Sequence, residues 1–265
     1  MARGLVCIAT GRYVRLVGDL VRACSRSGIV DRLFCLTDDP ASLQRRASRG
    51  GRVEVLYLPW GGLAWPLPTL WRYHAIDLYA DLLGASVSHL LYCDVDMRPL
   101  GPCDELFGDR LVAVAHPGYW SANPETFPYE RDPRSAAFLR GRPGHRYVAG
   151  GVQGGPAGPY LSAVAELRRR IQRDHLRGVS AVWHDESHWN RYVADHGHQL
   201  TVAGPEFCWP ESWPVPAGVA EPRLLALDKD HHGLRGTRPS LRETSRTSLG
   251  RVKRGLRSLG ARRAV

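Results

Sequence analysis

The sequence lacks the long apolar run that a membrane-spanning helix requires. Such a helix needs about 20 consecutive apolar residues, and no segment of the 265-residue chain approaches that length. The apolar run within residues 4–10 is too short for most signal peptides, and no small-residue cleavage site follows it. We therefore expect this run to form a first strand, and the protein to be cytoplasmic.

Paired cysteine motifs are also missing. The six cysteines include no Cys-x-x-Cys pair and no spacing typical of zinc ligands. Most stand in apolar contexts, where a free cysteine behaves as a small hydrophobic residue. A reduced compartment is therefore favoured over a disulfide framework. The six are Cys7, Cys24, Cys35, Cys93, Cys103 and Cys208.

Lysine is scarce, and the positive charge is unevenly distributed. Only two lysines occur, and the formal net charge is +10. Residues 236–265 hold nine basic side chains against one acid (Glu243), a surplus of +8 that leaves +2 for residues 1–235. The nearly neutral body and the absence of a nucleic-acid-binding module argue against a nucleic-acid partner.

Strands alternate with helices through the first half of the chain. The pattern predicts strands over 4–10, 31–39, 52–59, 88–96 and 110–118, and helices over 12–28, 40–47 and 68–84. This alternation indicates an α/β fold, a Rossmann-like and mostly parallel sheet with helices on both faces. The second half is more irregular, with one clear helix around 158–178, and we expect it to pack against the sheet.

Two aspartates one residue apart form the first candidate site. Asp94 and Asp96 come at the end of the strand predicted over 88–96. Side chains two apart on a strand face the same way, so both carboxylates could ligate Mg²⁺ or Mn²⁺. Ligands of parallel sheets bind beyond the carboxyl ends of the strands, where this pair and His116 both fall. A solvated pair of loop acids is the alternative.

A second acidic pair stands between two histidines in residues 184–188. If the segment opens a helix, Asp185 and Glu186 favour its first turn electrostatically. His184 and His188 raise a zinc alternative, but the zinc motif HExxH places glutamate directly after the first histidine, and here Asp185 stands there. A polar helix cap without chemistry is the other alternative.

Residues 147–155 contain four glycines. Glycine lets the backbone approach a ligand closely. The segment is neither a G-x-G-x-x-G fingerprint nor a P-loop, because no Gly-Lys-Ser/Thr follows. It is therefore interpreted as a tight wall beside a sugar.

Further short motifs accompany these segments along residues 5–235. They are Asp94-Val95-Asp96-Met97, His116-Pro117-Gly118-Tyr119, Phe127-Pro128-Tyr129-Glu130-Arg131, Gly150-Gly151 before Gly154-Gly155, Ala181 to Tyr192, Pro205-Glu206-Phe207-Cys208-Trp209, and Lys229-Asp230-His231 with Arg235. Their order and spacing resemble glycosyltransferase family 6, which includes the histo-blood-group A and B transferases and the α-1,3-galactosyltransferase.

The resemblance implies a GT-A fold over 1–235, with a nucleotide-binding half (1–118) and an acceptor-side half (119–235), followed by a basic tail (236–265). It implies a soluble, bacterial-type hexosyltransferase. Such an enzyme moves N-acetylgalactosamine or galactose from a UDP-sugar to a galactoside-containing glycan in α-1,3 linkage. The anomeric configuration is retained, and Mn²⁺ or Mg²⁺ assists.

The resemblance also assigns roles by position. The metal ligands are Asp94 and Asp96. The donor-binding positions are Ile8, Ala9, Thr10, Tyr13, Trp65, Arg72, Asp94, Val95, Asp96, Ala149, Gly150, Gly151, His184, Asp185, Lys229 and Arg235. The acceptor-binding positions are His116, Trp183, Glu186, Trp209 and Glu211. Glu186 is the expected nucleophile or stabiliser of an oxocarbenium-like state, and Asp185 is expected to orient the donor sugar.

Departures from the family pattern bear on the substrates. Val152-Gln153 replaces a usual Phe-Phe pair, and Pro210 replaces an acceptor-contacting aspartate, whose place Glu211 would take. Small side chains at Ala149 and Gly151 leave space for a 2-acetamido group, which favours UDP-GalNAc. A UDP-Gal-specific transferase and a sugar-nucleotide binder without turnover are the alternatives.

The tail carries an apolar stripe at helical spacing. Leu249, Val252, Leu256 and Leu259 form the stripe, and most basic side chains lie off it. Such a helix can lie on an anionic membrane, which would place the enzyme at the inner face. A disordered tail is the alternative.

Overall fold

The structure is a computed structural model that describes residues 2–47, 52–61, 63, 66–140, 146–230 and 233–234. The chain divides into two units, Met1–Asp228 and Lys229–Val265. The helices and strands below all belong to the first unit. Trp65, Arg235 and the expected tail helix lie outside the described residues. The division into halves at residue 118 stays a prediction.

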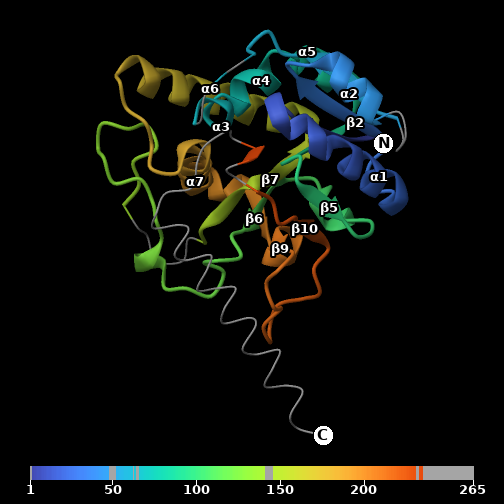
Figure 1. Cartoon of the computed structure of the whole chain (residues 1–265). Helices are drawn as coiled ribbons and strands as arrows, with labels where there is room; N and C mark the ends of the chain where they lie inside the picture. The colour runs from blue at the N-terminus through green and yellow to red at the C-terminus, as the bar shows by residue number, and fades with distance from the viewer. Residues whose placement is uncertain are drawn as a thin grey trace, which may run out of the picture. The chain divides into compact units, whose positions relative to one another are not determined.

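A seven-stranded sheet forms the centre of the first unit (Figure 1). Among the described residues its strand order is β3-β2-β1-β4-β7-β6-β8. The strands are β1 (Arg3–Ile8), β2 (Arg32–Thr37), β3 (Glu54–Tyr57), β4 (His89–Cys93), β6 (Leu111–Ala115), β7 (Val148–Pro156) and β8 (Leu200–Ala203). β7 runs antiparallel to both of its neighbours, β4 and β6, and the other pairs are parallel. The predicted α/β class with a mostly parallel sheet is confirmed.

Helices cover both faces of the sheet, as expected. In β1, Leu5 and Cys7 belong to the core cluster that includes α1 and α2, whereas Val6 belongs to the cluster of α4, α6 and α7. This is the alternation of side chains that a strand imposes. The helices are α1 (Val17–Ser27), α2 (Pro40–Ala47), α3 (Leu67–Leu70), α4 (Arg72–Asp77), α5 (Ala80–Ser86), α6 (Ala157–Leu176) and α7 (His184–His196).

Short 3₁₀ turns and a small sheet complete the first unit. The 3₁₀ turns are Gly11–Leu16, Asp104–Leu106, Pro124–Thr126, Gly197–Gln199 and Pro205–Phe207. In the small sheet, β10 (Leu224–Ala226) pairs antiparallel with β5 (Met97–Pro99) and parallel with β9 (Trp209–Pro210). The sequence pattern did not predict this sheet, because its strands have at most three residues, too few to show a period.

The single helix predicted over 68–84 is wrong, since three short helices occupy this stretch. Within this stretch, five apolar side chains stand at roughly helical spacing: Leu70, Tyr73, Ile76, Leu78 and Leu82. Leu78 and Leu82 are 52% and 42% exposed, while Leu83 is fully buried. The break at Tyr79, whose hydroxyl donates to the Tyr57 carbonyl, turns α5 so that a different face packs inward.

The glycine-rich segment forms β7, a strand inside the sheet, and its interpretation as a wall beside a sugar stays a prediction. Glycine weakens strands unless another backbone approaches closely. A Cβ on Gly154 would come 2.4 Å from the Leu90 carbonyl oxygen, and one on Gly155 would come 2.8 Å from the Arg110 carbonyl oxygen. The glycines therefore allow β7 to fit between β4 and β6.

The cysteines and the helices agree with two further expectations. All six cysteines are free and buried. No helix in the described part of the chain has the length and apolar character needed to cross a bilayer. The N-terminal apolar run forms β1.

Candidate active site

The candidate site begins where β1 and β4 end. These strands are parallel neighbours, with Val6 opposite Tyr92, so residues 8–10 and 94–96 follow at the same edge. Ala9 is buried and donates its N–H to the Leu36 carbonyl at 2.8 Å. Thr10 and Tyr13 begin the 3₁₀ turn after β1, and Tyr13 packs against the core. The expected donor residues of both segments therefore share one edge.

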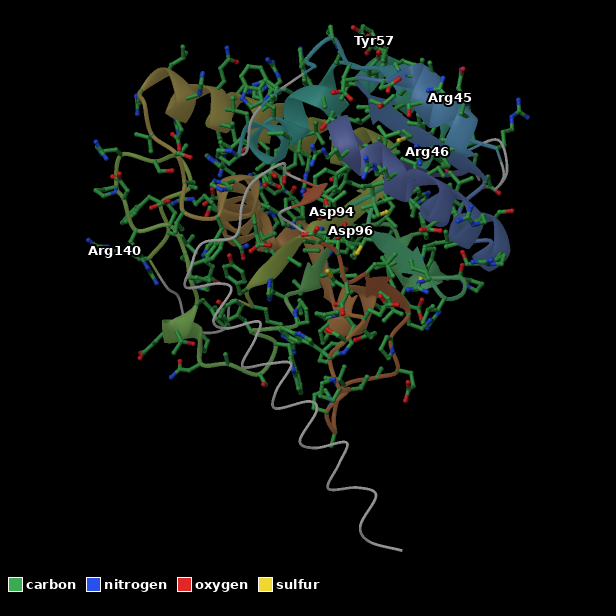
Figure 2. All side chains as sticks on the ribbon, in the orientation of Figure 1. Arg45, Arg46, Tyr57, Asp94, Asp96 and Arg140 are labelled. Atoms are coloured by element: carbon green, nitrogen blue, oxygen red, sulfur yellow. The ribbon has the colours of Figure 1, made fainter. Side chains whose placement is uncertain are left out.

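The aspartate pair lies in a turn and not on a strand. Figure 2 labels the side chains of both residues. β4 ends at Cys93, and the Met97 N–H donates to the Asp94 carbonyl at 3.1 Å. The strand alternation assumed for this pair is therefore wrong. The turn is held instead by backbone contacts, since the Asp94 N–H donates to the Gly151 carbonyl at 2.9 Å and the Leu227 N–H donates to the Asp96 carbonyl at 2.9 Å.

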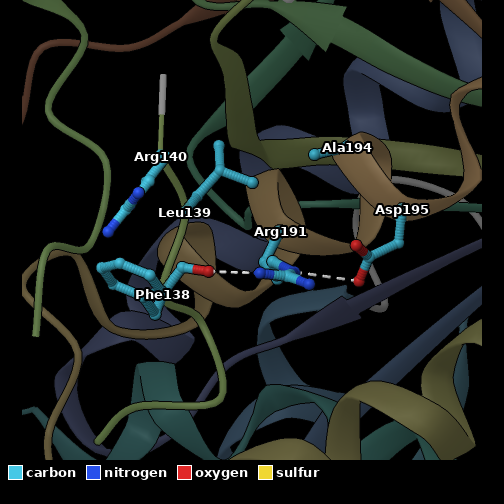
Figure 3. Close-up of a pocket in the computed structure, with 6 residues that line it drawn as sticks. All are labelled: Phe138, Leu139, Arg140, Arg191, Ala194 and Asp195. Atoms are coloured by element: carbon cyan, nitrogen blue, oxygen red, sulfur yellow. Dashed lines mark hydrogen bonds and ion pairs between the residues drawn. The ribbon is translucent and has the colours of Figure 1, made fainter. Parts of the chain in front are cut away.

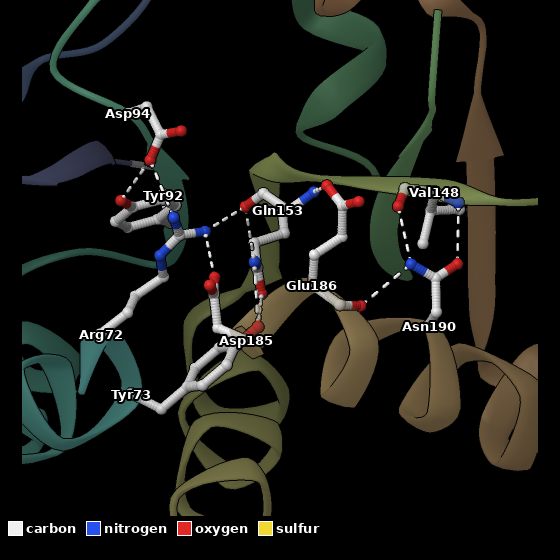
Figure 4. Close-up of polar contacts among 10 residues, drawn as sticks. Arg72, Tyr73, Tyr92, Asp94, Val148, Gln153, Asp185, Glu186 and Asn190 are labelled. Carbon is white, nitrogen blue, oxygen red and sulfur yellow. Dashed lines mark hydrogen bonds and ion pairs between the residues drawn. The ribbon is translucent and has the colours of Figure 1, made fainter. Parts of the chain in front are cut away.

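Arg72 links this turn to helix α7 (Figure 4). Its side chain is 7% exposed, and its Nη2 lies 3.0 Å from Asp94 Oδ1. Its Nη1 lies 3.0 Å from Asp185 Oδ2 and also donates to the Gly150 carbonyl. The guanidinium carbon lies 4.4 Å from the centre of the Tyr92 ring, and the Tyr92 hydroxyl donates to Asp94 at 2.7 Å. One buried cation therefore joins both acidic pairs.

Asp185 and Glu186, neighbours at the start of α7, have different surroundings. Burial raises the pKa of Asp185 from 3.8 to about 7, with Arg72 opposing the rise and Asp94 and Glu186 adding to it. Glu186 is half-buried and accepts two hydrogen bonds of 2.8 Å, from the Tyr147 hydroxyl and the Gly150 N–H. Burial and the Glu186 charge raise the pKa of Tyr147, which keeps it a donor. The two bonds fix the direction of the Glu186 carboxylate.

The start of α7 is held in a conformation rare for a side-chain-bearing residue. His184 has φ +53°, and it is the only non-glycine residue with positive φ in the described ranges. Buried Glu130 accepts the Val182 N–H at 2.6 Å, and Ser187 Oγ accepts the Trp183 N–H at 3.0 Å. Glu130 appeared in the sequence only as part of a motif, and its role here as an anchor was not predicted.

The zinc alternative for the two histidines finds no support. His188 is 1% exposed and its Nε2 lies 3.6 Å from Asp174 Oδ2, inside the core. Burial lowers the pKa of His188 to about 3, and Arg170 and Arg173 add to this. No group of three or more His, Cys, Asp or Glu side chains suited to a metal occurs within the residues that the structure describes.

The glycines of β7 stand where a side chain would meet the acids. A Cβ on Gly150 would lie 3.2 Å from the Glu186 Cβ, and one on Gly151 would lie 3.0 Å from Asp94 Oδ2. Ala149 and Val95 are each 4% exposed and pack in the core. The pairing of β7 with β6 shifts here, since Ala113 pairs with Gln153 but Val114 pairs with Ala149. Such bulges occur next to active sites.

The expected acceptor residues are placed with unequal exposure. His116 follows β6, and burial lowers its pKa while Glu186 opposes this. Trp183 is 49% exposed, whereas Trp209 is 3% exposed and donates its Nε1–H to the Trp213 carbonyl at 3.2 Å. The side chain of Glu211 pairs with Arg98 and accepts the Asp228 N–H at 3.3 Å.

Trp213 was missed by the sequence interpretation. It is 47% exposed, and its ring lies 3.8 Å from the position of a Cβ on Gly118, two residues after His116. An aromatic residue four positions after Trp209 was the available signal. Of the remaining donor residues, Trp65 and Arg235 lie outside the described residues, and Lys229 belongs to the second unit.

A hollow of about 180 Å³ lies elsewhere on α7 (Figure 3). Its lining is mostly apolar, and its acid, Asp195, already pairs with Arg191 at 3.0 Å and with Arg170 at 2.9 Å. None of the predicted site residues lines it. We therefore locate the candidate site by the arrangement of Arg72, Asp94, Asp185 and Glu186, and not by this pocket.

Known proteins resemble this chain along most of its length. The family model described as glycosyltransferase family 6 matches residues 1–236. Globoside alpha-1,3-N-acetylgalactosaminyltransferase 1 of Canis lupus familiaris is 31% identical over 239 residues, which cover 88% of this chain and 68% of the relative. Histo-blood group ABO system transferase 1 of Rattus norvegicus is 27% identical with the same coverage. Alpha-1,3-galactosyltransferase 2 of Homo sapiens is 28% identical over 88% of this chain and 69% of its own length.

Proposed function

The chain belongs to glycosyltransferase family 6 and is a hexosyltransferase, and we propose that it moves N-acetylgalactosamine from UDP-GalNAc to a β-galactoside-type acceptor in α-1,3 linkage with retention. The observation that carries this proposal is that Asp94 and Glu186 hydrogen-bond to the Gly150–Gly151 backbone, while Asp185 pairs with Arg72, which donates to the Gly150 carbonyl. Asp94, the Gly150–Gly151 segment and the Asp185–Glu186 pair come from three separate parts of the chain. Relatives named for N-acetylgalactosamine transfer support the choice of donor.

The aspartate turn fits a metal-bound diphosphate. Asp94 Oδ1 is taken by Tyr92 and Arg72, whereas Oδ2 faces the position that a Gly151 Cβ would fill. Mg²⁺-type sites commonly use one or two carboxylates together with substrate phosphates, so Asp94 and Asp96 suffice. When bound, Mn²⁺ or Mg²⁺ would supply Lewis acidity to the diphosphate that leaves with the nucleotide.

In the proposed mechanism, Glu186 acts at the anomeric carbon of the donor sugar. Its carboxyl group accepts two hydrogen bonds and keeps further lone pairs for the sugar. It either attacks the anomeric carbon as the bond to UDP breaks, or stabilises positive charge there while the acceptor hydroxyl attacks. Asp185 orients the sugar hydroxyls, and Arg72 adds positive charge where negative charge develops on the departing UDP. Lys229 and Arg235 are proposed to contact the same diphosphate.

A transfer assay on a glycan array tests the proposal. The protein is incubated with UDP-GalNAc or UDP-Gal, with Mn²⁺ or with EDTA, and the product linkage is determined by NMR. We expect an α-1,3-linked N-acetylgalactosamine product that disappears with EDTA. A β-linked product would contradict retention, and UDP binding without any transfer would identify a sugar-nucleotide binder.

Preferential use of UDP-Gal would support the second candidate, a galactosyltransferase. The similarity to a human α-1,3-galactosyltransferase favours this candidate. The small side chains at Ala149 and Gly151 favour the bulkier donor instead.

A further inference from the structure

Gln153 is a buried amide on β7, three residues after Gly150 of the candidate site. It is fully buried in β7, opposite Tyr92 on β4 and Ala113 on β6. Burial of an amide is costly unless its donors and acceptors are satisfied. The hydrogen-bond partners of this buried amide therefore determine whether its presence in the strand is favourable.

Both ends of the Gln153 amide have partners (Figure 4). The Tyr73 hydroxyl donates to Gln153 Oε1 at 3.2 Å and lies 3.1 Å from Nε2. Nε2 donates to the Gly150 carbonyl at 3.0 Å. That carbonyl also accepts Arg72 Nη1, the atom that pairs with Asp185 at 3.0 Å. Gln153 and Arg72 therefore share one acceptor.

The Gly150 carbonyl has no strand ladder with β6 to orient it. Residues 150–152 fall in the register shift between Ala113 and Val114, so they lack β6 partners. Gly150 also lacks a side chain that would restrict its backbone. Gln153 and Arg72 both donate to this carbonyl, and of these two residues Gln153 belongs to the regularly paired part of β7.

We propose that Gln153 is a positioning residue, because its amide fixes the Gly150 carbonyl that holds Arg72 between Asp94 and Asp185. Because Gln153 is fully buried, we expect it to contact neither the donor nor the acceptor. Arg72 has three partners on three different elements, so a small rotation of its guanidinium would break at least one contact. The inference rests on the proposed function, which places Asp94 and Asp185 at the donor.

A double-mutant cycle distinguishes positioning from simple packing. The variants are Gln153→Leu, Arg72→Lys and their combination, with Tyr73→Phe as the matched control that keeps the bond from Gln153 to Gly150. Gln153→Leu is expected to lower kcat about 10-fold and to leave KM for the acceptor within about twofold. Added to Arg72→Lys, it should cost no more than a further ~twofold, because it acts through Arg72.

Additive losses in the cycle would overturn the proposal. So would a fall in kcat with Tyr73→Phe as large as that with Gln153→Leu, since packing alone would then explain both. Thermal melting reports whether each variant is folded.

A crystal structure of Gln153→Leu separates failure of this proposal from failure of the proposed function. We expect Arg72 Nη1 to leave either Gly150 or Asp185. An unmoved guanidinium would refute the positioning role, whether or not the parent protein transfers a sugar.

Discussion

The proposed donor edge and the proposed catalytic side of the candidate site are stabilised by different kinds of contact. The donor edge, residues 8–13 and 94–96, follows two parallel strands and is held mainly by backbone hydrogen bonds. The catalytic side, Gly150 with Asp185 and Glu186, joins an antiparallel strand to a helix start through buried side chains. Backbone contacts tolerate substitutions, whereas a buried charge without its partner is costly. The catalytic side should therefore be the more sensitive to mutation.

Glu186→Gln should have the largest effect. It removes the negative charge at the anomeric carbon while keeping the size of the side chain, so kcat should fall by about 1000-fold or more. Steady-state transfer assays measure the loss. Glu221→Gln, at an exposed position, is the control and should change kcat by less than about twofold. A kcat for Glu186→Gln within tenfold of the parent would remove Glu186 from the mechanism.

Arg72→Ala should disturb both the donor edge and the catalytic side, because Arg72 contacts both. It leaves Asp94 and Asp185 without their shared cation, and loss of one partner from a buried pair typically costs about 3 kcal/mol. We expect this loss of stability in denaturant unfolding, together with a loss of transfer of about 100-fold. Arg134→Ala breaks an exposed pair with Asp132 and should leave the stability nearly unchanged, because water screens that pair. Equal losses in the two variants would contradict a special role for Arg72.

Gly151→Ala tests the donor edge separately, because the substitution is on β7 but the added Cβ would crowd Asp94. The new Cβ would lie 3.0 Å from Asp94 Oδ2. Such crowding should lower kcat/KM for UDP-GalNAc about 20-fold and shift preference toward UDP-Gal. Gly158→Ala meets nothing within 4 Å and is the control. Equal or greater turnover of UDP-GalNAc by Gly151→Ala would contradict both the crowding and the donor assignment.

The pH dependence should show the smallest effect. Because burial holds the pKa of Asp185 at about 7, the ionised fraction, and with it kcat, should rise about threefold between about pH 6.5 and about pH 7.5. In Asp185→Asn, kcat should no longer rise with pH over this range. A parent activity that falls across this range would show that the protonated form is required.

The same raised pKa has a consequence for stability. The unfolded chain ionises Asp185 near 3.8, whereas the folded state keeps it protonated up to about 7. Asp185 therefore opposes folding increasingly as the pH rises between these values. As the pH rises from 3.8 to about 7, the melting temperature of Asp185→Asn should therefore increase relative to that of the parent. The opposite trend would place an ionised Asp185 in the folded state.

Sequence patterns located the two acidic pairs but misjudged how they are held. The Asp94–Asp96 pair was placed at the end of a strand, yet it lies in a turn because β4 stops at Cys93. The glycines of 147–155 suggested close approach, and Gly154 and Gly155 approach neighbouring strands while Gly150 and Gly151 approach the acids. The helix predicted over 68–84 is interrupted at Tyr79, which hydrogen-bonds to Tyr57. A helical spacing of apolar residues gives no information about such a contact.

The sequence by itself determined the alternation of strands and helices and the presence of acids and glycines at their ends. These are local features, since side-chain periodicity and turn chemistry act over a few residues. Only the tertiary structure decided that Arg72 reaches Gly150 from 78 residues away, and that Gly150 reaches Glu186 from 36. Contacts of that span depend on how the strands are ordered in the sheet, and no short stretch of sequence encodes that order.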